Sequence, residues 1–423
     1  MSTAAGPSSG TPHPEFRLGW RVLLAAMLGV ACGASPIPFN TIGFFMAPLQ
    51  AEFGWSLREI SLGVTIYGVL AALLAPVFGS MADRYGVRPV ALWSLFAFAL
   101  AFACFGLTPA SIMGFYFIWF LVGLVGIGST PVTWSRAVNL WFFRRRGLAL
   151  GIALMGTSIA GMVLPKLTVW LIDSFGWRMA YPLLALLPLL VALPVAYALF
   201  REPRLEERPP ELSSDDGSGR MELSGLTLGQ ALRGYRFWLM FASIAAVAFA
   251  YGGAHIHMAG IVTGHGFSRG DAATVASLLG LSILCGRLVT GWLLDRFWAP
   301  GVVLPILSLP ALSCILLAGD SITLGWIMGA AFLLGFAAGA ESDLIAYLAG
   351  RYFGMRQYGR IYGMLYMPFG IASAVSPLVY GAVHDASGSF APILKVAAVC
   401  FVLGAVLLLG LGRYPPQGTL RPA

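Results

Sequence analysis

A few charged or titratable side chains lie inside long apolar stretches, and their types suit anion binding and proton transfer. Arg287 interrupts one stretch, and a guanidinium stays charged and binds a carboxylate through two parallel hydrogen bonds. Glu341 and Asp343 lie in another, and a desolvated carboxyl can take up and release a proton. His257 lies in a third, and histidine titrates near neutral pH. A charge at membrane depth costs several kcal/mol, so each group is a functional candidate.

Arg287 also has a structural alternative, an ion pair with Glu341 or Asp343. It lies eight residues before Asp295, about 12 Å along a helix at 1.5 Å per residue. Small residues dominate its helix face and leave room for a cavity. Two carboxylates two positions apart point about 200° apart around a helix, so both cannot face one cavity. One of them can pair with Arg287, and a static pair and a proton-exchanging group both stay open.

Other polar side chains within apolar stretches could line the same cavity. Lys166 follows Pro165 near the end of a stretch and either snorkels outward or faces the cavity. His255 and His257 are two positions apart, so they do not form a pair of ligands for one metal, and either can serve as a simple interhelical hydrogen-bonding group. The uncharged candidates are Asn40, Tyr67, Trp134, Tyr251 and Tyr366. The five cysteines show no paired spacing, so we expect no metal, cofactor or disulfide framework.

The composition places these side chains in a membrane. The chain is 58% hydrophobic and 10% charged, with a mean hydropathy of +0.81, whereas globular proteins carry about 25% charged residues. Stretches of about 20 apolar residues cross a bilayer as helices. We therefore expect an all-α integral membrane protein with twelve transmembrane helices, near 20–48, 58–82, 89–108, 112–140, 147–172, 179–200, 236–263, 271–294, 300–319, 322–349, 359–384 and 389–411.

The net charge of +8 reports orientation and not a nucleic-acid partner. If the N-terminus is cytoplasmic, most of the Lys and Arg residues fall on cytoplasmic segments, as the positive-inside rule requires. Both termini are then cytoplasmic. The apolar run after the polar first nineteen residues is too long for a cleavable signal peptide. We expect a multi-pass protein of the bacterial inner membrane, with the lipid bilayer as its surroundings, that acts as a monomer.

The chain divides into two related halves. The hydrophilic segment 201–235 is rich in Pro, Glu, Ser, Asp and Gly, which is typical of a mobile linker. It separates a six-helix bundle at 20–200 from another at 236–411, with tails at 1–19 and 412–423. A shift of 212 residues aligns the halves on residue types that chance would rarely match in apolar sequence, among them Gly68 with Gly280, Asp83 with Asp295, Pro165 with Pro377, and Asp173 with Asp385. Such an internal duplication is a known transporter architecture.

A short charged motif is repeated at the same place in both halves. "GSMADRYGVR" begins at Gly79, and "GWLLDRF" begins at Gly291. The first resembles the cytoplasmic loop signature of the major facilitator superfamily, with one departure at Val87. That resemblance covers essentially the whole chain and implies that the motif is a latch between the halves, broken and formed during transport. The residues that it assigns to the latch are Gly79, Asp83, Arg84, Gly86 and Arg88, with Gly291, Asp295 and Arg296 in the second half.

A narrower resemblance concerns the bacterial monocarboxylate and oxalate–formate branch. It is carried by "FGWSLREISL" at 53–62, "FFRRRGLALGIALMG" at 142–156, "IDSFGWR" at 172–178, "GRLVTGWLLDRF" at 286–297 and "RYFGMRQYGRIYGMLY" at 351–366. In that branch an arginine of span eight binds the substrate anion, and Arg287 stands at that place. A histidine of span seven stands at His257. The oxalate–formate members carry a lysine in span eleven, where Phe369 stands here, and the animal monocarboxylate members carry one in span one, near Phe39. The loss of both argues against a dianion such as oxalate.

We therefore expect a secondary active transporter and not an enzyme. It would move a small organic anion, a monocarboxylate or similar compound, together with protons, by alternating access. Substrate-binding roles are expected for Arg287, His257, Asn40, Tyr67, Tyr366 and Lys166, and proton coupling at Glu341 or Asp343. Export of a hydrophobic drug-like compound is the main alternative, and a non-transporting membrane sensor is another. No ATP-binding loop is present in the sequence.

Overall fold

The chain folds almost entirely into helices. The computed structural model describes residues 15–142, 146–201, 203, 225–294, 296–319, 322–354 and 356–414. In the N-terminal half these helices are α1 Glu15–Ala31, α2 Pro36–Phe53, α3 Leu57–Tyr85, α4 Val87–Ala103, α5 Ile112–Gly126, α6 Pro131–Trp141, α7 Arg146–Leu186 and α8 Leu193–Leu199. In the C-terminal half they are α10 Leu228–Arg233, α11 Tyr235–Ile256, α12 Met258–Gly264, α13 Arg269–Leu294, α14 Ala299–Leu317, α15 Leu324–Phe353, α16 Tyr358–Ser387 and α17 Ala391–Leu409.

Within the described residues, eleven helical stretches are long and apolar enough to cross a membrane. One of them, Leu148–Leu199, has 52 residues, about 78 Å of helix, whereas one crossing needs about 30 Å. It bends at Gly176, where φ is +78°, a left-handed value that glycine adopts without steric cost. This stretch therefore makes two crossings, and the prediction of a twelve-span, all-helical membrane protein is confirmed.

Two spans are broken near their middles, where the sequence supplies a reason. The first span breaks between α1 and α2, just before Pro36, which starts α2 because proline suits the first turn of a helix. The chain continues in the same direction, because Ile37 still donates its N–H to the Gly33 carbonyl. The seventh span breaks at His257, where φ is −90° and ψ is 6°, between α11 and α12. Such breaks re-aim the side chains on either side of them.

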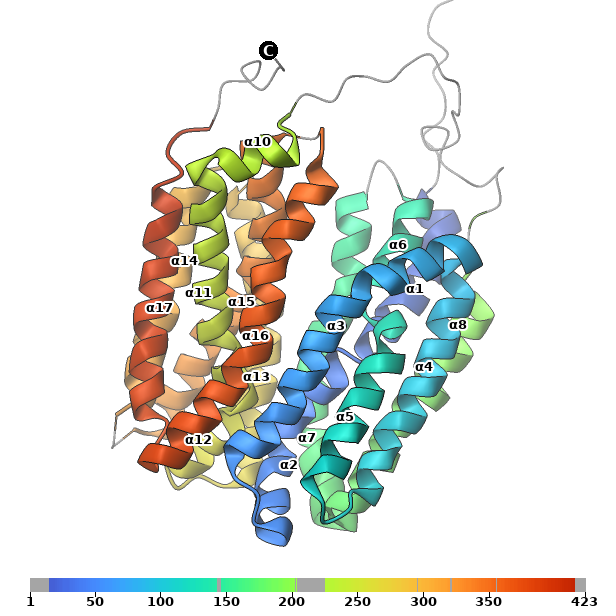
Figure 1. The fold of residues 1–423 in the computed structure, drawn as a ribbon, viewed down its shortest axis with the longest axis vertical. Helices are drawn as coiled ribbons and strands as arrows, with labels where there is room; N and C mark the ends of the chain where they lie inside the picture. The colour runs from blue at the N-terminus through green and yellow to red at the C-terminus, as the bar shows by residue number, and fades with distance from the viewer. Residues whose placement is uncertain are drawn as a thin grey trace, which may run out of the picture.

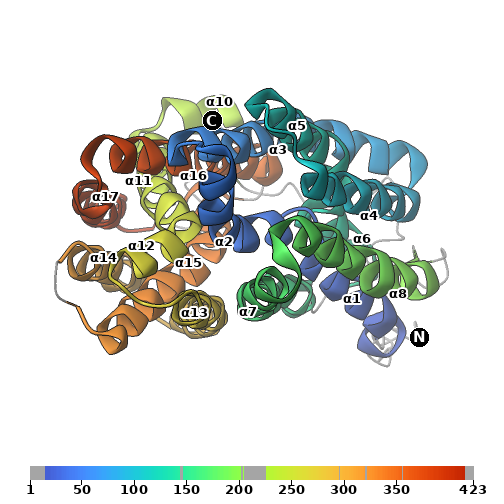
Figure 2. The same ribbon diagram turned by 90° about the horizontal axis from the view of Figure 1, so that it is seen from below.

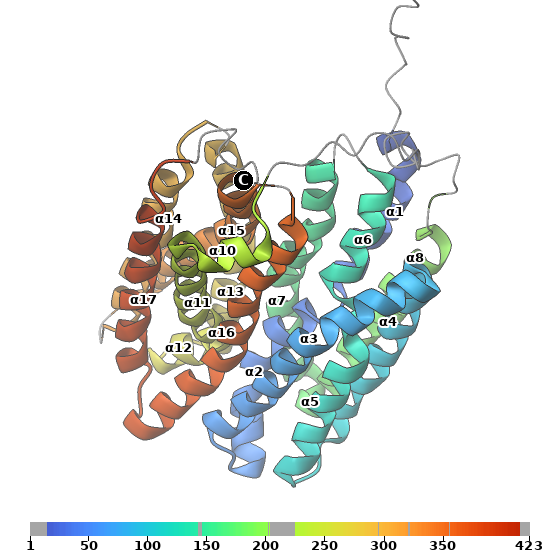
Figure 3. The ribbon, with the colours of Figure 1, turned by 45° about the horizontal axis from the view of Figure 1, so that its top comes forward.

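The two halves lie side by side and meet mainly at one end (Figure 1; Figure 3). We call the closed end the one that carries residues 54–57, 264–268 and 385–390. The open end carries residues 85–87, 294–298 and 353–357. Contacts between the halves run along α3 with α16 and along α7 with α13, and α2 also touches α12. The closest approaches lie in the parts of these helices nearer the closed end.

The duplication seen in the sequence is visible in these contacts. Figure 2 shows α3 beside α16 and α7 beside α13. A Cβ added at Gly68 of α3 would lie 2.5 Å from the Cβ of Ala374. A Cβ added at Gly280 of α13 would overlap the backbone at Gly161 and Met162. Gly68 and Gly280 are 212 residues apart, as are Met162 and Ala374. The two contacts are therefore equivalent under a pseudo-twofold relation between the halves.

The expected linker, 201–235, extends too far at its C-terminal side. Gly225 pairs with Gly354, and Leu226 donates its N–H to the Phe353 carbonyl at 2.8 Å. Helix α10 follows, and its first turn is fixed by a capping box in which Thr227 and Gln230 bond to each other's backbone N–H. Among the described residues, the chain therefore contacts the C-terminal half from residue 225 onward. The N-terminal bundle also begins earlier than expected, because α1 starts at Glu15.

Candidate functional site

Close packing of α13 on α15 places the backbone of Arg287 against Gly339, two residues before Glu341. A Cβ on Gly339 of α15 would lie 2.9 Å from the Arg287 backbone nitrogen, and a Cβ on Gly286 of α13 would overlap the backbone at Phe336. Small residues allow two transmembrane helices to approach this closely. The sequence "GFAAGAE" therefore brings Glu341 within about one helical turn of the level of Arg287.

Polar side chains from several helices of the C-terminal half lie near this level and form a cluster. Arg287 and Glu341 both lie within electrostatic range of the Tyr366 hydroxyl on α16, and Glu341 lies within range of the Tyr251 hydroxyl on α11. The Tyr251 ring stacks on His255, with ring centroids 5.3 Å apart and planes 12° apart. Tyr366 is 40% exposed, so the cluster reaches a surface that protein does not cover. Four helices of the C-terminal half thus contribute to one polar site.

Two members of this cluster carry buried polar atoms without a hydrogen-bond partner in the described structure. They are the Tyr251 hydroxyl and Oε1 of Glu341. Leaving such an atom unsatisfied costs about 1–3 kcal/mol, so each of them would gain from a hydrogen-bonding partner such as a water molecule or a ligand. A bound ligand or an added proton would satisfy these atoms. Both are consistent with a site that binds and releases its cargo.

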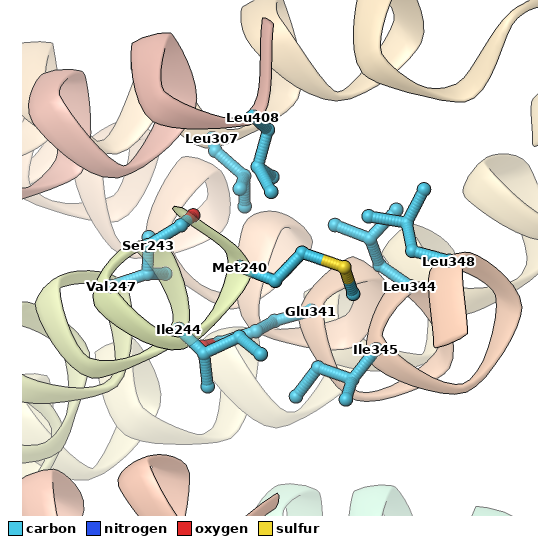
Figure 4. Close-up of a pocket in the computed structure, with 10 residues that line it drawn as sticks. All are labelled: Met240, Ser243, Ile244, Val247, Leu307, Glu341, Leu344, Ile345, Leu348 and Leu408. Atoms are coloured by element: carbon cyan, nitrogen blue, oxygen red, sulfur yellow. The ribbon is translucent and has the colours of Figure 1, made fainter. Parts of the chain in front are cut away.

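Glu341 itself is enclosed by apolar side chains. It is 3% exposed and borders a small internal cavity between α11, α14, α15 and α17 (Figure 4). The cavity has room for about one water molecule. Its other lining residues are Met240, Ser243, Ile244, Val247, Leu307, Leu344, Ile345, Leu348 and Leu408. An isolated ionised carboxylate in such surroundings is unfavourable, so this position suits a carboxyl that is protonated in part of a cycle.

A second small cavity lies between the halves. Helices α2 and α7 line one side, and α11, α12 and α13 line the other. Its polar lining residues are Asn40 and His255. The Asn40 amide donates from Nδ2 to the Pro36 carbonyl at 2.7 Å, which fixes its orientation. Asn40 therefore lies at the junction of the halves, and its expected role in substrate binding stays a prediction.

His257 does not line this cavity, in contrast to the prediction that favoured it over His255. It is 1% exposed, and Nε2 donates to the Pro377 carbonyl at 2.9 Å. Nε2 also lies 3.3 Å from Oγ of Ser61, on α3 of the opposite half. The break in the helix at His257 turns this side chain toward α16. It is therefore an interhelical hydrogen-bonding group, the alternative that the sequence had left open.

Tyr67 and Lys166 also lie away from the polar cluster. Tyr67 is 2% exposed, and its hydroxyl donates to the Ala34 carbonyl at 2.6 Å, so the hydroxyl is already used in packing α3 on the first span. Lys166 is exposed and shares its helix face with Val163 and Trp170, which are 53% and 57% exposed. That face is directed toward lipid, where a lysine can snorkel. We leave both residues out of the site proposed below.

The first loop motif lies at the open end, at the end of α3. Gly86 forms the turn into α4 with a φ of +89°, which explains the glycine there. Arg88 donates to the Tyr197 carbonyl at 2.6 Å, within the same half, and Arg84 is exposed beside the ring of Tyr85. The side chain of Asp83 lies outside what the structure describes. Where they are described, these arginines contact their own half.

The second motif gives the same result. Arg296 stacks on Trp292, with its guanidinium carbon 4.0 Å from the ring centroid. A Cβ on Gly291 would meet no atom within 4 Å, and Asp295 lies outside the described residues. Gly291 therefore makes no close contact with another helix in this structure.

Sequence reasoning missed the side chains that join the halves at the closed end. Asp385 of α16 accepts hydrogen bonds from the backbone N–H groups of Leu57 and Arg58 at the start of α3, and Thr65 donates to the Ala374 carbonyl at 2.7 Å. The alignment of Asp385 with Asp173 was the available signal, but it does not show which other helix an aspartate faces. Among the described residues, no group of three or more His, Cys, Asp or Glu side chains is arranged to hold a metal ion.

Comparison with known proteins identifies the fold and the family. The chain is 27% identical to mouse monocarboxylate transporter 11, over 98% of this chain and 90% of that protein. It is 26% identical to the hexuronate transporter of Escherichia coli K12, over 92% and 93%. A crystal structure of a bacterial homologue of the human lysosomal transporter Spinster, inward-facing and unoccupied, superposes with a TM-score of 0.63 at 17% identity, over 95% of this chain and 96% of that one. The sequence profile described as Major Facilitator Superfamily matches residues 24–377. The chain belongs to the Major Facilitator Superfamily of secondary transporters.

Proposed function

We propose that this transporter moves small organic monocarboxylates together with protons. The observation that carries the proposal is the polar cluster around Arg287, in which Glu341 and Tyr251 hold buried polar atoms without partners in the described structure. A carboxylate substrate supplies the negative charge that a guanidinium binds. Named relatives that transport monocarboxylates or hexuronates support the same substrate class.

Each residue of the cluster receives one role. Arg287 binds the substrate carboxylate, and the hydroxyls of Tyr251 and Tyr366 donate hydrogen bonds to it. Asn40 contacts the substrate from the opposite half when the halves close over it. Glu341 carries the proton, with Asp343 as the alternative carrier on the same helix.

Electrostatic repulsion between negative charges couples substrate binding to protonation of Glu341. A substrate anion beside Arg287 adds negative charge near Glu341, and like charges close together disfavour each other's ionised forms. Substrate and proton therefore bind more readily together than separately, and such coupling is reciprocal by thermodynamic necessity. The protein would carry the pair across as a nearly neutral unit.

The cycle alternates between two conformations of the halves. The described structure joins them at the closed end and leaves the open end apart. We propose that the open end faces the cytoplasm of a bacterial cell, as the distribution of Lys and Arg indicates, and that the protein acts as a monomer. The motifs that begin at Gly79 and Gly291, with Asp83, Asp295 and their arginines, close the open end in the other state.

Transport of radiolabelled lactate and pyruvate into proteoliposomes, with and without an imposed proton gradient, tests this proposal. We expect accumulation driven by the gradient. Arg287→Ala should reduce uptake at least a hundredfold, because the cost of leaving a buried anion unpaired is about 3 kcal/mol or more. Arg287→Lys should recover part of it, since lysine keeps the charge but loses the two parallel bonds.

Arg269→Ala is a matched control, because Arg269 is an exposed arginine at the other end of the same helix. It should leave uptake unchanged. Glu341→Gln should abolish accumulation against a gradient while exchange of labelled for unlabelled substrate continues. Uptake that survives Arg287→Ala would refute the proposed anion site.

A further inference from the structure

We propose that Asp385 is a latch at the closed end, where its carboxylate caps the first turn of α3 from the opposite half. This inference rests on the alternating movement proposed above but not on any particular substrate. Asp385 lies near the end of α16, in the C-terminal half, and α3 begins in the N-terminal half. The contact therefore holds the two halves together at the end that the loop motifs do not reach.

The hydrogen bonds at the start of α3 are shared between the two halves. Helices leave their first backbone N–H groups without intrahelical partners. In α3 the third of these, on Glu59, bonds to the side chain of Ser56 in the same half. The first two bond to Asp385, from Leu57 to Oδ1 at 3.2 Å and from Arg58 to Oδ2 at 2.8 Å. Without Asp385, two N–H groups at this helix start lose their protein partner.

The electrostatics of this contact are favourable as well. The amino end of a helix carries a partial positive charge, and a carboxylate placed there is stabilised. Hydrogen bonds to a charged acceptor are roughly twice as strong as neutral ones. The nearest titratable neighbour is His384, whose Nδ1 lies 3.9 Å from Oδ1 of Asp385. Arg58 itself is exposed.

The contact continues a line of cross-half interactions along α3 and α16. A Cβ on Gly381 would lie 2.9 Å from the backbone of Leu57 and Arg58, so this glycine permits the approach of Asp385. Farther along, Ser61 faces His257 at 3.3 Å, and Thr65 bonds to Ala374. The α3–α16 contact is thus bonded over three turns of helix.

The α7–α13 contact lacks such a hydrogen-bonded aspartate in the described structure, although the duplication places an aspartate at the equivalent position. Asp173 of α7 corresponds to Asp385, and Arg269 and Gly270 at the start of α13 correspond to Leu57 and Arg58. Asp173 is exposed, and no hydrogen bond joins it to α13 in the described part of the chain. Ser277, which corresponds to Thr65, has a buried hydroxyl without a partner there. The α7–α13 contact is made by glycine backbone at Gly161 and Gly280.

It follows that opening of the closed end requires the α3–α16 contact to break. Movement between α3 and α16 must break the two Asp385 bonds, whereas α7 and α13 can slide past each other at their glycines. Asp385 therefore sets how often the closed end opens. Asp173 provides a control of the same type in the equivalent position.

The test measures the width of the closed end by electron–electron spin distances in the full-length protein in lipid nanodiscs. Labels are placed at Ala110→Cys and Thr323→Cys, two exposed sites in loops of opposite halves at that end, after replacement of the five native cysteines. We expect Asp385→Asn to raise the ratio of open to closed molecules roughly tenfold. Asp385→Ala should raise it at least as far, because no acceptor remains.

Asp173→Asn and Asp173→Ala should change this ratio less than twofold. An unchanged ratio in Asp385→Ala would overturn the proposal, and so would an equal shift in Asp173→Ala. The near-isosteric Asn variants guard against misfolding as an explanation. No substrate is present in this experiment, so an error in the substrate proposed for the transporter would leave its result intact.

Discussion

Replacing Gly280 by alanine should force the closed end open. A Cβ at this position overlaps the backbone at Gly161 and Met162 of the opposite half. A backbone cannot rotate out of the way as a flexible side chain can, so the helices α7 and α13 must separate. The clash exists only while the halves are joined there. Gly280→Ala therefore disfavours one conformation of the transporter and spares the other.

The size of the effect can be derived from packing. Overpacking a tight contact costs typically about 1–3 kcal/mol. Alanine also favours a helix over glycine by about 1 kcal/mol, but this gain is the same in both conformations and cancels from their ratio. The open-to-closed ratio should therefore rise by a factor of about 5 to 150.

Chemical labelling measures this shift. Asn40 borders the small cavity between the halves, so a cysteine at Asn40 in a cysteine-free background reports access from the closed end. A membrane-impermeant maleimide added on that side should react at least fivefold faster in Gly280→Ala. Gly329→Ala is the matched control, because a Cβ at this α15 position meets no atom within 4 Å. Equal labelling rates in Gly280→Ala and in the parent would refute the reasoning.

Two further substitutions test the placement of individual side chains. Tyr67→Phe removes the hydroxyl that donates to the Ala34 carbonyl at 2.6 Å. The free energy of unfolding, measured by thermal denaturation, should fall by about 1 kcal/mol, while the apparent KM for substrate stays unchanged. A raised KM would show that Tyr67 contacts the substrate. The Arg178 guanidinium binds Glu52 at 2.6 Å and the Thr108 carbonyl at 3.0 Å. Arg178→Lys should lower the Tm only slightly, because the side chains of Arg178 and Glu52 are both about 40% exposed. An unaltered Tm would show that these two guanidinium contacts do not stabilise the fold.

The sequence was sufficient for the architecture because the bilayer imposes simple rules. Apolar length predicts the spans, and the shared Gly, Pro and Asp positions predict the two halves. The cost of burying polar groups in the spans indicated Arg287, Glu341, Tyr251 and Tyr366 as candidates, and their roles stay predictions.

The remaining features depend on tertiary packing that one chain does not encode locally. His255 and His257 are two positions apart, and only the break at His257 decides that His255 faces the inter-half cavity. The sequence predicts Tyr67 as a cavity residue, and only the structure shows that its hydroxyl donates to the Ala34 carbonyl. The latch role of the loop motifs stays a prediction, because the described arginines Arg84, Arg88 and Arg296 contact their own half.

The early start of the C-terminal half at residue 225 has a mechanical consequence. The pairing of Gly225 with Gly354 anchors the incoming chain to the second bundle, so the tether between the bundles runs only from residue 201 to residue 225. At roughly 3.5 Å per residue such a tether still reaches about 80 Å when fully drawn out. That length exceeds the thickness of the hydrocarbon core, about 30 Å, so we expect that shortening the segment by several residues leaves the turnover rate unchanged.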